Sequence, residues 1–185
     1  MAQYDKEKWN KRYQNNPIPD TPIELITKYS TYAKKGKALD IACGMGRHSK
    51  YLASIGFKVD ALDISSVAIK TIQNLPNINA KEVDFDNYQL EKERYELIVC
   101  SFFLKRELFP QIVNALKSGG VFIYETFVYH PDNQQVPSSR SYLLESGELE
   151  ESFRGKLEFI YIDEYWSKTM KGEKMRLASF VGRRV

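Results

Sequence analysis

The sequence predicts an α/β fold with a doubly wound, mostly parallel sheet and an antiparallel hairpin near its C-terminal end. Three observations predict it. Short apolar segments alternate with helical patterns from residue 38 to residue 126. The segment at 95–102 is almost continuously apolar, which is typical of a central strand buried on both faces. Two further strand-like segments, at 157–165 and 175–182, follow one another without room for a helix between them.

Length and composition indicate one globular domain. The chain has 185 residues, of which 43% are hydrophobic and 28% charged, so it is long enough to bury a full core. The net charge is +3, and the basic residues are scattered, so the sequence carries no strong nucleic-acid signal. We expect one domain over residues 1–185, with oligomeric state left open.

Several classes of protein are not favoured by the sequence. No apolar run approaches the roughly 18 residues of a membrane span, and the polar N-terminus does not resemble a signal peptide. Cys43 and Cys100 lie in apolar segments, so we expect them to be buried and reduced. No Cys/His cluster has metal-ligand spacing, so no metal site is expected. Together these features predict a cytoplasmic protein without a membrane partner.

The N-terminal region predicts two helices. The first covers residues 4–13, and residues 15–19 interrupt it with two prolines. The second begins at Thr21, which we expect to act as the N-cap, with Pro22 at the first helical position and Glu24 closing a capping box. It runs to about Lys34, and Gly36 ends it.

The central region repeats strand, turn and helix. The predicted elements are a strand at 38–42, a tight turn at 43–46, a helix at 48–55, a strand at 57–63, a helix capped by Ser65 or Ser66, a strand at 77–83, a strand at 95–102, a helix at 110–117 and a strand at 121–126. Right-handed crossovers between such strands give a parallel sheet. A long polar loop at 128–140 follows, and loops of this length are often functional.

This layout divides the domain into three parts. We expect an N-terminal helical cap at 1–35, a ligand-binding core at 36–127, and a substrate-side loop with the hairpin at 128–185. In an open parallel sheet the ligand lies beyond the carboxyl ends of the strands, so the residues at these ends are the ones to inspect.

The turn after the first strand predicts the kind of ligand. Gly44 and Gly46 permit positive φ and close approach of a ligand, but a dinucleotide fingerprint would have a third glycine where Ser49 stands. Asp40 precedes the turn, and its carboxylate would repel a pyrophosphate but accept hydrogen bonds from an ammonium group. S-adenosylmethionine has an ammonium group and no phosphate, so this ligand is favoured.

Two other strand ends carry acids that suit such a ligand. Asp63 ends the second strand, where a carboxylate can bind two ribose hydroxyls. Asp84 ends the third strand and can accept a bond from an adenine amino group, with Phe85 packing on the base. The alternatives are local: Asp63 can cap the helix that begins near Ser65, and Asp84 can hold a turn with the residues that follow it.

The stretch from Asp40 to Gly46 resembles motif I of the class I S-adenosylmethionine-dependent methyltransferases, D/E-x-G-x-G-x-G, with Ala42 in place of the first glycine. The segment WNKRY at 9–13 is similar to the W-x-x-R-Y segment of small bacterial methyltransferases related to the tellurite-resistance protein TehB. Segments 103–109, 123–127 and 143–149 are also similar to that group.

The resemblance implies a Rossmann-like, doubly wound seven-stranded sheet that binds S-adenosylmethionine, releasing S-adenosylhomocysteine as product. It also implies that Arg12 and Tyr13 fold over the cofactor as a lid. The alternative is that Trp9 and Tyr13 simply pack the first helix on the core. The predicted cofactor-binding residues are Arg12, Tyr13, Asp40, Ala42, Cys43, Gly44, Met45, Gly46, His48, Asp63, Ile64, Ser65, Asp84, Phe85, Asp86, Cys100, Ser101 and Phe102.

Catalysis would come mainly from positioning, because a sulfonium methyl group is already activated for in-line displacement. Aromatic faces such as that of Tyr13 can stabilise the cation. A sulfur or chalcogen nucleophile needs no general base, whereas an oxygen nucleophile does, and His130, Glu125 and Tyr129 are candidates for one. Arg106 and Arg140 are candidates for holding an anionic substrate, and the alternative for both is a surface salt bridge.

These observations predict a methyltransferase that acts on a small molecule. After the fourth strand there is no Asp/Asn-Pro-Pro-Tyr/Phe run, the signature of N-methylation of a planar amino group. One alternative is a nicotinamide-dependent oxidoreductase on a Rossmann-like sheet. Another is a protein that binds S-adenosylmethionine without catalysis. The sequence does not specify the methyl acceptor.

Overall fold

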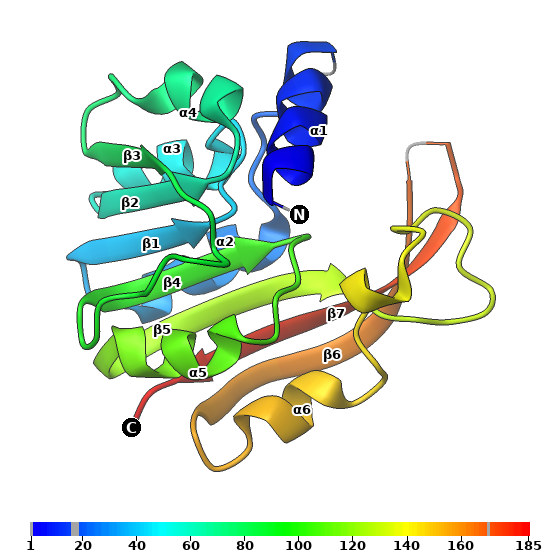
Figure 1. Ribbon diagram of the computed structural model, residues 1–185. Coiled ribbons are helices and arrows are strands. Elements are labelled where there is room, and N and C mark those ends of the chain that lie inside the picture. Colours follow the sequence, from blue (N-terminus) through cyan, green and yellow to red (C-terminus); the bar gives the residue numbers. More distant parts are fainter. Residues whose placement is uncertain (1, 16–18, 170) are drawn as a thin grey trace.

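A seven-stranded sheet organises the computed structural model, which describes residues 2–15, 19–169 and 171–185 (Figure 1). The strand order is β3-β2-β1-β4-β5-β7-β6. The strands are β1 (Lys37–Ile41), β2 (Lys58–Asp63), β3 (Ile78–Glu82), β4 (Tyr95–Ser101), β5 (Leu116–Phe127), β6 (Glu158–Lys168) and β7 (Lys174–Arg183). Strands β1 to β5 pair in parallel, and β7 runs antiparallel to both of its neighbours. The predicted fold class is confirmed.

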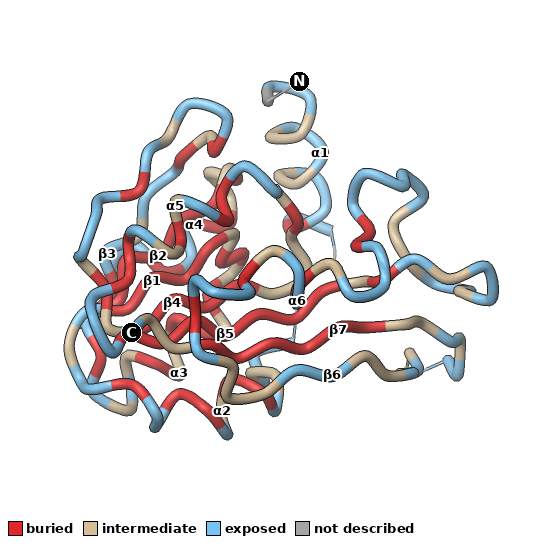
Figure 2. The backbone as a smooth tube through the Cα atoms, turned by 90° about the horizontal axis from the view of Figure 1, so that it is seen from below, coloured by how far each residue is buried: buried red, intermediate tan, exposed pale blue. Residues whose placement is uncertain are grey.

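Helices cover both faces of the sheet. On one face α2 (Glu24–Tyr29), α3 (Arg47–Ser54) and α4 (Ser66–Ile72) pack against the apolar side chains of the strands. On the other face α5 (Leu108–Ala115) and α6 (Glu148–Phe153) cover a second apolar cluster. Figure 2 shows the result, with the central strands buried and the outer strand β6 mostly exposed or half-buried.

The first helix stands apart from these two layers. Helix α1 (Ala2–Asn15) packs on α4 beside the carboxyl ends of β2 and β3 (Figure 1). It confirms the expected N-terminal helix and extends it at both ends. Tyr13 is its one buried residue among those whose side chains are described. Part of the predicted break at 15–19 lies outside the described residues.

The prediction for the second helix was wrong in its start and its length. Helix α2 begins at Glu24, its N-cap is Ile23, and no side chain caps it. The N–H of Ile23 instead donates to Nε2 of His48 on α3, 3.4 Å away. A tertiary contact therefore replaces the expected capping box. The helix ends at Tyr29 and is followed by a 3₁₀ turn, Ser30–Tyr32.

Other boundaries differ by a few residues. Ser65 is the cap of α4, since its Oγ accepts from the N–H of Ala68 at 3.1 Å. Helix α5 lies two residues earlier than expected, and β5 begins at Leu116 instead of residue 121. The register of β4 and β5 shifts between Tyr95 and Leu97, so the Gly119-Gly120 pair forms part of an irregular strand. Helix α6 was not predicted.

The loop at 128–140 crosses toward the start of α6. The N–H of Tyr129 donates to the carbonyl oxygen of Leu144 at 2.8 Å, and Leu144 donates to that of Phe127 at 2.9 Å. Within the described part of the chain, no helix is long and apolar enough to cross a membrane, and no group of three or more His, Cys, Asp or Glu is placed to hold a metal ion.

Candidate functional site

The glycine turn joins β1 to α3 at the carboxyl edge of the sheet. Ala42, Gly44 and Gly46 all have positive φ, at 53°, 53° and 76°. The N–H of Gly46 donates to the carbonyl oxygen of Cys43 at 3.0 Å, which closes the turn. A Cβ added at Gly46 would lie 2.7 Å from Cγ2 of Ile72, so glycine is also required for α3 to approach α4. Both glycines are buried, and glycine is the residue that permits a close approach of a ligand to the backbone.

Asp63 at the end of β2 is bonded to this turn. Its Oδ2 accepts from the N–H of Gly44 and its Oδ1 from the N–H of Ser65, both at 2.8 Å. Burial, at 4% exposure, raises the pKa of this carboxyl although both hydrogen bonds act the other way. The contact with Ser65 is the local role considered from the sequence. A carboxylate has about four lone-pair sites, so Asp63 can still accept from a ligand hydroxyl beside its backbone hydrogen bonds.

Asp40 lies below the turn and not at its surface. It is 1% exposed, and its Oδ2 accepts from Oγ of Ser49 at 2.6 Å. Burial raises the pKa of Asp40 to about 7, so the carboxyl is close to half-protonated at neutral pH. In this conformation it acts on a ligand mainly through its charge.

Helix α1 brings Tyr13 to the same edge. Burial, followed by the nearby charge of Asp63, raises the pKa of Tyr13, which keeps the phenol neutral. Its ring stacks on Trp9 at 5.6 Å between centroids, and the Arg12 guanidinium lies 5.3 Å from the Trp9 ring centre. Oδ1 of Asn10 accepts from Oγ of Ser65 at 2.6 Å and so fixes α1 to the start of α4. The packing of Trp9 and Tyr13 considered as the alternative is present, and the lid role of Arg12 and Tyr13 stays a prediction.

A cleft of about 200 Å³ separates α1 from the ends of β2 and β3. Its lining residues are Gln3, Lys6, Ile64, Glu82, Val83 and Asp84. Lys6 and Glu82 form an ion pair across it. Asp84 accepts from the N–H of Asp86 at 2.9 Å and from Nδ2 of Asn87 at 2.8 Å. The turn considered as the local alternative for Asp84 is therefore present, and Asp84 also borders the cleft.

Phe85 and Asp86 point elsewhere. The Phe85 ring is buried and packs against Phe103 at 5.6 Å between centroids. Asp86 forms an ion pair with Lys105 at 2.6 Å. Because the Phe85 ring makes these contacts, the contact with adenine that was predicted for Phe85 would be made by its backbone and not by its ring.

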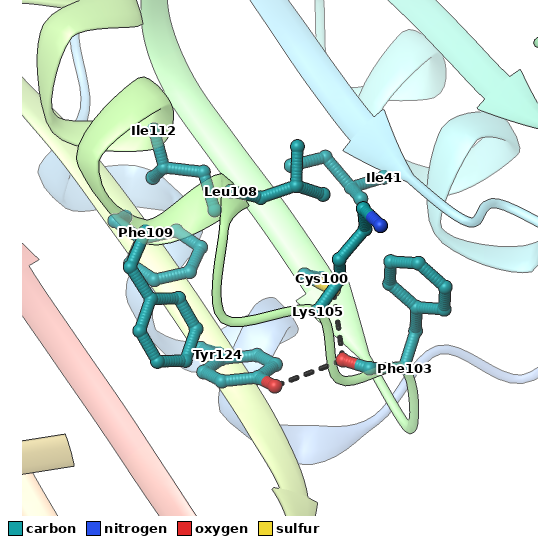
Figure 3. Close-up of a pocket in the computed structure, with 9 residues that line it drawn as sticks. Ile41, Cys100, Phe103, Lys105, Leu108, Phe109, Ile112 and Tyr124 are labelled. Carbon is teal, nitrogen blue, oxygen red and sulfur yellow. Dashed lines mark hydrogen bonds between the residues drawn. The ribbon is translucent and has the colours of Figure 1, made fainter. Parts of the chain in front are cut away.

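The side chain of Cys100, near the end of β4, belongs to the core. Cys100 points into the core, where Figure 3 shows it with Tyr124, Phe109 and Ile112. These residues line a small space of about 10 Å³. The carbonyl oxygen of Phe103 accepts from Tyr124 Oη at 2.8 Å and lies 3.6 Å from Cys100 Sγ. Burial raises the pKa of this thiol, and the same holds for Cys43 in the other cluster. Both cysteines are free and buried, as expected.

The His48 side chain lies within the site and makes structural contacts there. Its Nε2 accepts from Ile23, and its Nδ1 lies 3.5 Å from Oγ of Ser101. Burial, with the nearby Arg47 charge, lowers the pKa of His48 to about 3, so the ring is neutral. We therefore assign its side chain to linking α2, α3 and β4.

The catalytic candidates are dispersed. Arg106 is held by Glu148 and by the carbonyl oxygens of Ser141 and Leu143. Arg140 pairs with Glu145 and lies 3.7 Å from the ring centre of Tyr129. Both arginines therefore make the surface contacts considered as their alternative.

His130 lies in the loop beyond β5. Its Nδ1 accepts from the N–H of Asp132 at 3.2 Å, and its ring meets the edge of Trp166. Glu125, in contrast, is 6% exposed and lies near the carboxyl end of β5. Its Oε2 accepts from Tyr165 Oη at 2.8 Å and from Ser179 Oγ at 2.7 Å.

Sequence reasoning missed several residues at this edge, including Asn10, Arg47, Tyr165 and Ser179. Arg47 directly follows the glycine turn, and this position was the available signal. Asn10 lies within the WNKRY segment, but nothing in the sequence places its side chain on Ser65. The contacts of Tyr165 and Ser179 with Glu125 depend on strand register across β5, β7 and β6, which the sequence pattern does not specify.

Comparison with known proteins agrees with this geometry. The model of the family described as "Tellurite resistance protein TehB" matches residues 1–177. A curated relative from Haemophilus influenzae, "Probable S-adenosyl-L-methionine-dependent methyltransferase TehB", is 27% identical over 164 residues, or 80% of this chain and 57% of that protein. The chain thus spans little more than half the length of this relative. A ribosomal protein L11 methyltransferase from Campylobacter concisus is 34% identical over 114 residues, covering 55% of this chain and 38% of that protein.

Solved structures show the same fold. The crystal structure of TehB from Haemophilus influenzae has a TM-score of 0.74 at 22% identity and covers 97% of this chain and 67% of that one. An S-adenosylmethionine-dependent methyltransferase from Methanosarcina mazei has a TM-score of 0.67 at 16% identity, over 89% and 99% of the two chains. Because the family model matches residues 1–177, nearly the whole of this chain, the chain belongs to the TehB family of class I S-adenosylmethionine-dependent methyltransferases.

Proposed function

We propose that this protein transfers the methyl group of S-adenosylmethionine to a small molecule. One observation carries the proposal: Asp63, at the end of β2, is held by the backbone N–H groups of Gly44 and Ser65 beside the positive-φ glycine turn. This is the position at which a carboxylate can bind ribose hydroxyls in an α/β sheet of this kind. The family match supports the same cofactor.

The residues present fit that cofactor along its length. The positive-φ turn at Gly44 and Gly46 suits the amino-acid portion, because glycine lets a ligand approach the backbone closely. Asp63 suits the ribose. The cleft of about 200 Å³ under α1 suits the base, and Asp84 at its border offers a carboxylate to an amino group.

The chain contributes mainly positioning and shielding. S-adenosylmethionine supplies an activated methyl group, so a soft nucleophile needs alignment and little else. Asp40 supplies negative charge from below the turn, opposite a ligand's ammonium group. Tyr13 and Phe102 supply aromatic faces near the edge of the sheet, which stabilise a cation that lies over them. Glu125 is fixed by Tyr165 and Ser179. It accepts a hydrogen bond from a methyl acceptor whose nucleophilic atom carries a proton.

A small acceptor is supported by a structural neighbour. A phosphoethanolamine N-methyltransferase from Haemonchus contortus, solved with phosphomonomethylethanolamine and S-adenosylhomocysteine, has a TM-score of 0.65 to this chain.

Isothermal titration with S-adenosylhomocysteine tests the proposal. We expect binding by the wild type and a loss of about tenfold or more in affinity for Asp63→Ala, which removes hydrogen bonds from a charged acceptor. Asp163→Ala, which removes an exposed carboxylate on β6, is the matched control and should bind normally. Absence of binding by the wild type would reject the cofactor assignment.

Turnover separates an enzyme from a protein that binds the cofactor without catalysis. We expect formation of S-adenosylhomocysteine when S-adenosylmethionine is supplied with a panel of thiols, oxyanions and small acids. Binding without turnover across the whole panel would favour the non-catalytic alternative. The comparisons do not favour the nicotinamide alternative, and a titration followed by NADH fluorescence checks it.

A further inference from the structure

Arg47 projects from the first position of α3 to the end of β4. Its Nη2 lies 3.5 Å from Oγ of Ser101, and its guanidinium carbon lies 5.7 Å from the ring centre of Phe102. The side chain is partly buried. Among the charged groups around it are Asp40 and Glu125, with Tyr13 also near enough to act on it. Arg47 therefore lies between the glycine turn and the end of β5.

This guanidinium lacks an ion-pair partner among the described residues, since no carboxylate oxygen lies within 4.0 Å of it. The two nearby carboxylates have other partners: Asp40 accepts from Ser49, and Glu125 accepts from Tyr165 and Ser179. Burial lowers the pKa of Arg47, because removing the charged guanidinium from water is unfavourable. A partly buried guanidinium has five N–H donors, and one contact of 3.5 Å leaves most of them free.

Three other arginines, Arg106, Arg140 and Arg176, differ from Arg47 in this respect. Arg106 has Glu148 and two carbonyl oxygens, Arg140 has Glu145, and Arg176 has Glu164 at 3.7 Å. Their donors are engaged by the chain itself. Arg47 combines partial burial, a free fork of donors and a position at the edge where the ligand lies.

We propose that Arg47 and Ser101 bind an anionic group, a carboxylate or an oxyanion, of the methyl acceptor. The proposal rests on the proposed function and adds a charge requirement to its substrate. A guanidinium fork binds planar anions through paired hydrogen bonds, and the Ser101 hydroxyl adds a donor beside it. Phe102 closes the apolar side. An acceptor anchored there brings its nucleophile to the edge of the turn, between Tyr13 and Glu125.

Two titrations of the protein saturated with S-adenosylhomocysteine test this site. The probes are 3-mercaptopropionate, which carries a carboxylate, and 3-mercapto-1-propanol, which is neutral. For the wild type we expect the acid to bind on the order of tenfold more tightly than the alcohol, as a charge-assisted pair would give. Arg47→Gln should abolish this preference, and Arg47→Lys should restore part of it.

The control is Lys50→Gln, which removes the same charge from the same helix. Lys50 pairs with Asp20 at the surface, so the preference should persist in this variant. The affinity for S-adenosylhomocysteine should stay within about twofold of wild type in Arg47→Gln, because a neutral replacement leaves Asp63 and the turn intact. Circular dichroism of each variant verifies folding, and Arg47→Lys keeps the test valid if the glutamine variant unfolds.

Three results would overturn the proposal. One is a wild type that binds the acid no better than the alcohol. Another is a preference that survives in Arg47→Gln. The third is an Arg47→Gln variant that loses cofactor affinity as much as acid affinity, since the arginine would then serve the cofactor. Failure of the wild type to bind S-adenosylhomocysteine at all is a separate result, which rejects the proposed function itself.

Discussion

Ala42 carries the main backbone strain of the glycine turn. Its φ of 53° lies in the left-handed region, which costs a residue with a Cβ about 1–2 kcal/mol relative to the right-handed one. The motif that this stretch resembles has glycine at this position. The strain is retained where the chain must turn sharply between β1 and the ligand edge.

We expect Ala42→Gly to raise the free energy of unfolding by up to about 1 kcal/mol, because relief of strain exceeds the added freedom of the unfolded chain. Urea denaturation measures this change. Ala38→Gly, at a buried position within β1, is the matched control and should lower stability by a similar amount. Equal destabilisation by both substitutions would contradict strain at Ala42.

Asp40 links the stability of the protein to pH. Its folded pKa, about 7, lies above the ordinary value of 3.8, so the folded state holds the proton more tightly than the unfolded state. The stabilising contribution of the protonated form is complete below about pH 4 and is lost as pH rises toward 7. At neutral pH the buried charge is therefore a cost to folding.

Asp40→Asn should remove this dependence. We expect the stability of the variant minus that of wild type to increase by on the order of 1–4 kcal/mol between pH 4.5 and pH 7.5, since three pKa units correspond to about 4 kcal/mol at most. Denaturation at several pH values measures the slope. A flat difference for Asp40→Asn would show that its carboxyl titrates normally.

At the scale of elements, α1 depends on few contacts. Among the described side chains of α1, only that of Tyr13 is buried. Asn10 forms a hydrogen bond with Ser65, and Lys6 forms an ion pair with Glu82 across the cleft. The helix thus covers the cleft but buries little of its own surface against the rest of the protein. Elements with so little burial open at low free-energy cost.

We expect Asn10→Ala to weaken binding of S-adenosylhomocysteine by about three- to tenfold, because a lost hydrogen bond of about 1 kcal/mol shifts the helix toward the open form. Amide exchange of α1 should accelerate while that of the central strands does not change. Asn15→Ala is the control on the same helix, since Asn15 bonds only to the nearby Lys11 carbonyl oxygen. Unchanged exchange in α1 would contradict a docking role for Asn10.

The comparison of sequence and structure also belongs to this scale. The strands and their parallel order could be predicted, because apolar runs and glycine turns are local signals. The start of α2 could not, since His48, 25 residues along the chain, accepts the N–H of Ile23. At the site, Asp63 and the turn could be located from spacing. The partners of Glu125 could not, because they come from β6 and β7 through register alone.

Across the whole molecule, the site draws on both halves of the sheet. Asp63 comes from β2 and Glu125 from β5, with β1 and β4 between them. The two tryptophans report on opposite ends of this arrangement: Trp9 lies in α1, and Trp166 lies on the outer strand β6.

We expect the two tryptophans to report different urea midpoints without ligand. In Trp166→Phe the remaining Trp9 should lose its folded signal first, because α1 is weakly held, whereas in Trp9→Phe the remaining Trp166 should follow the sheet. Saturating S-adenosylhomocysteine should raise both midpoints and bring them together, since ligand binding at 100 times Kd adds about 2.7 kcal/mol. Coincident midpoints without ligand would show that α1 unfolds with the sheet.

The position of β7 between β5 and β6 has a consequence for how the protein is made. Synthesis on the ribosome proceeds from the N-terminus, so β7 emerges after both of the strands that it joins. Until then β5 has a free edge, β6 has no partner, and Glu125 lacks Ser179. The nascent chain therefore carries an open strand edge, a template for aggregation, until β7 has been made.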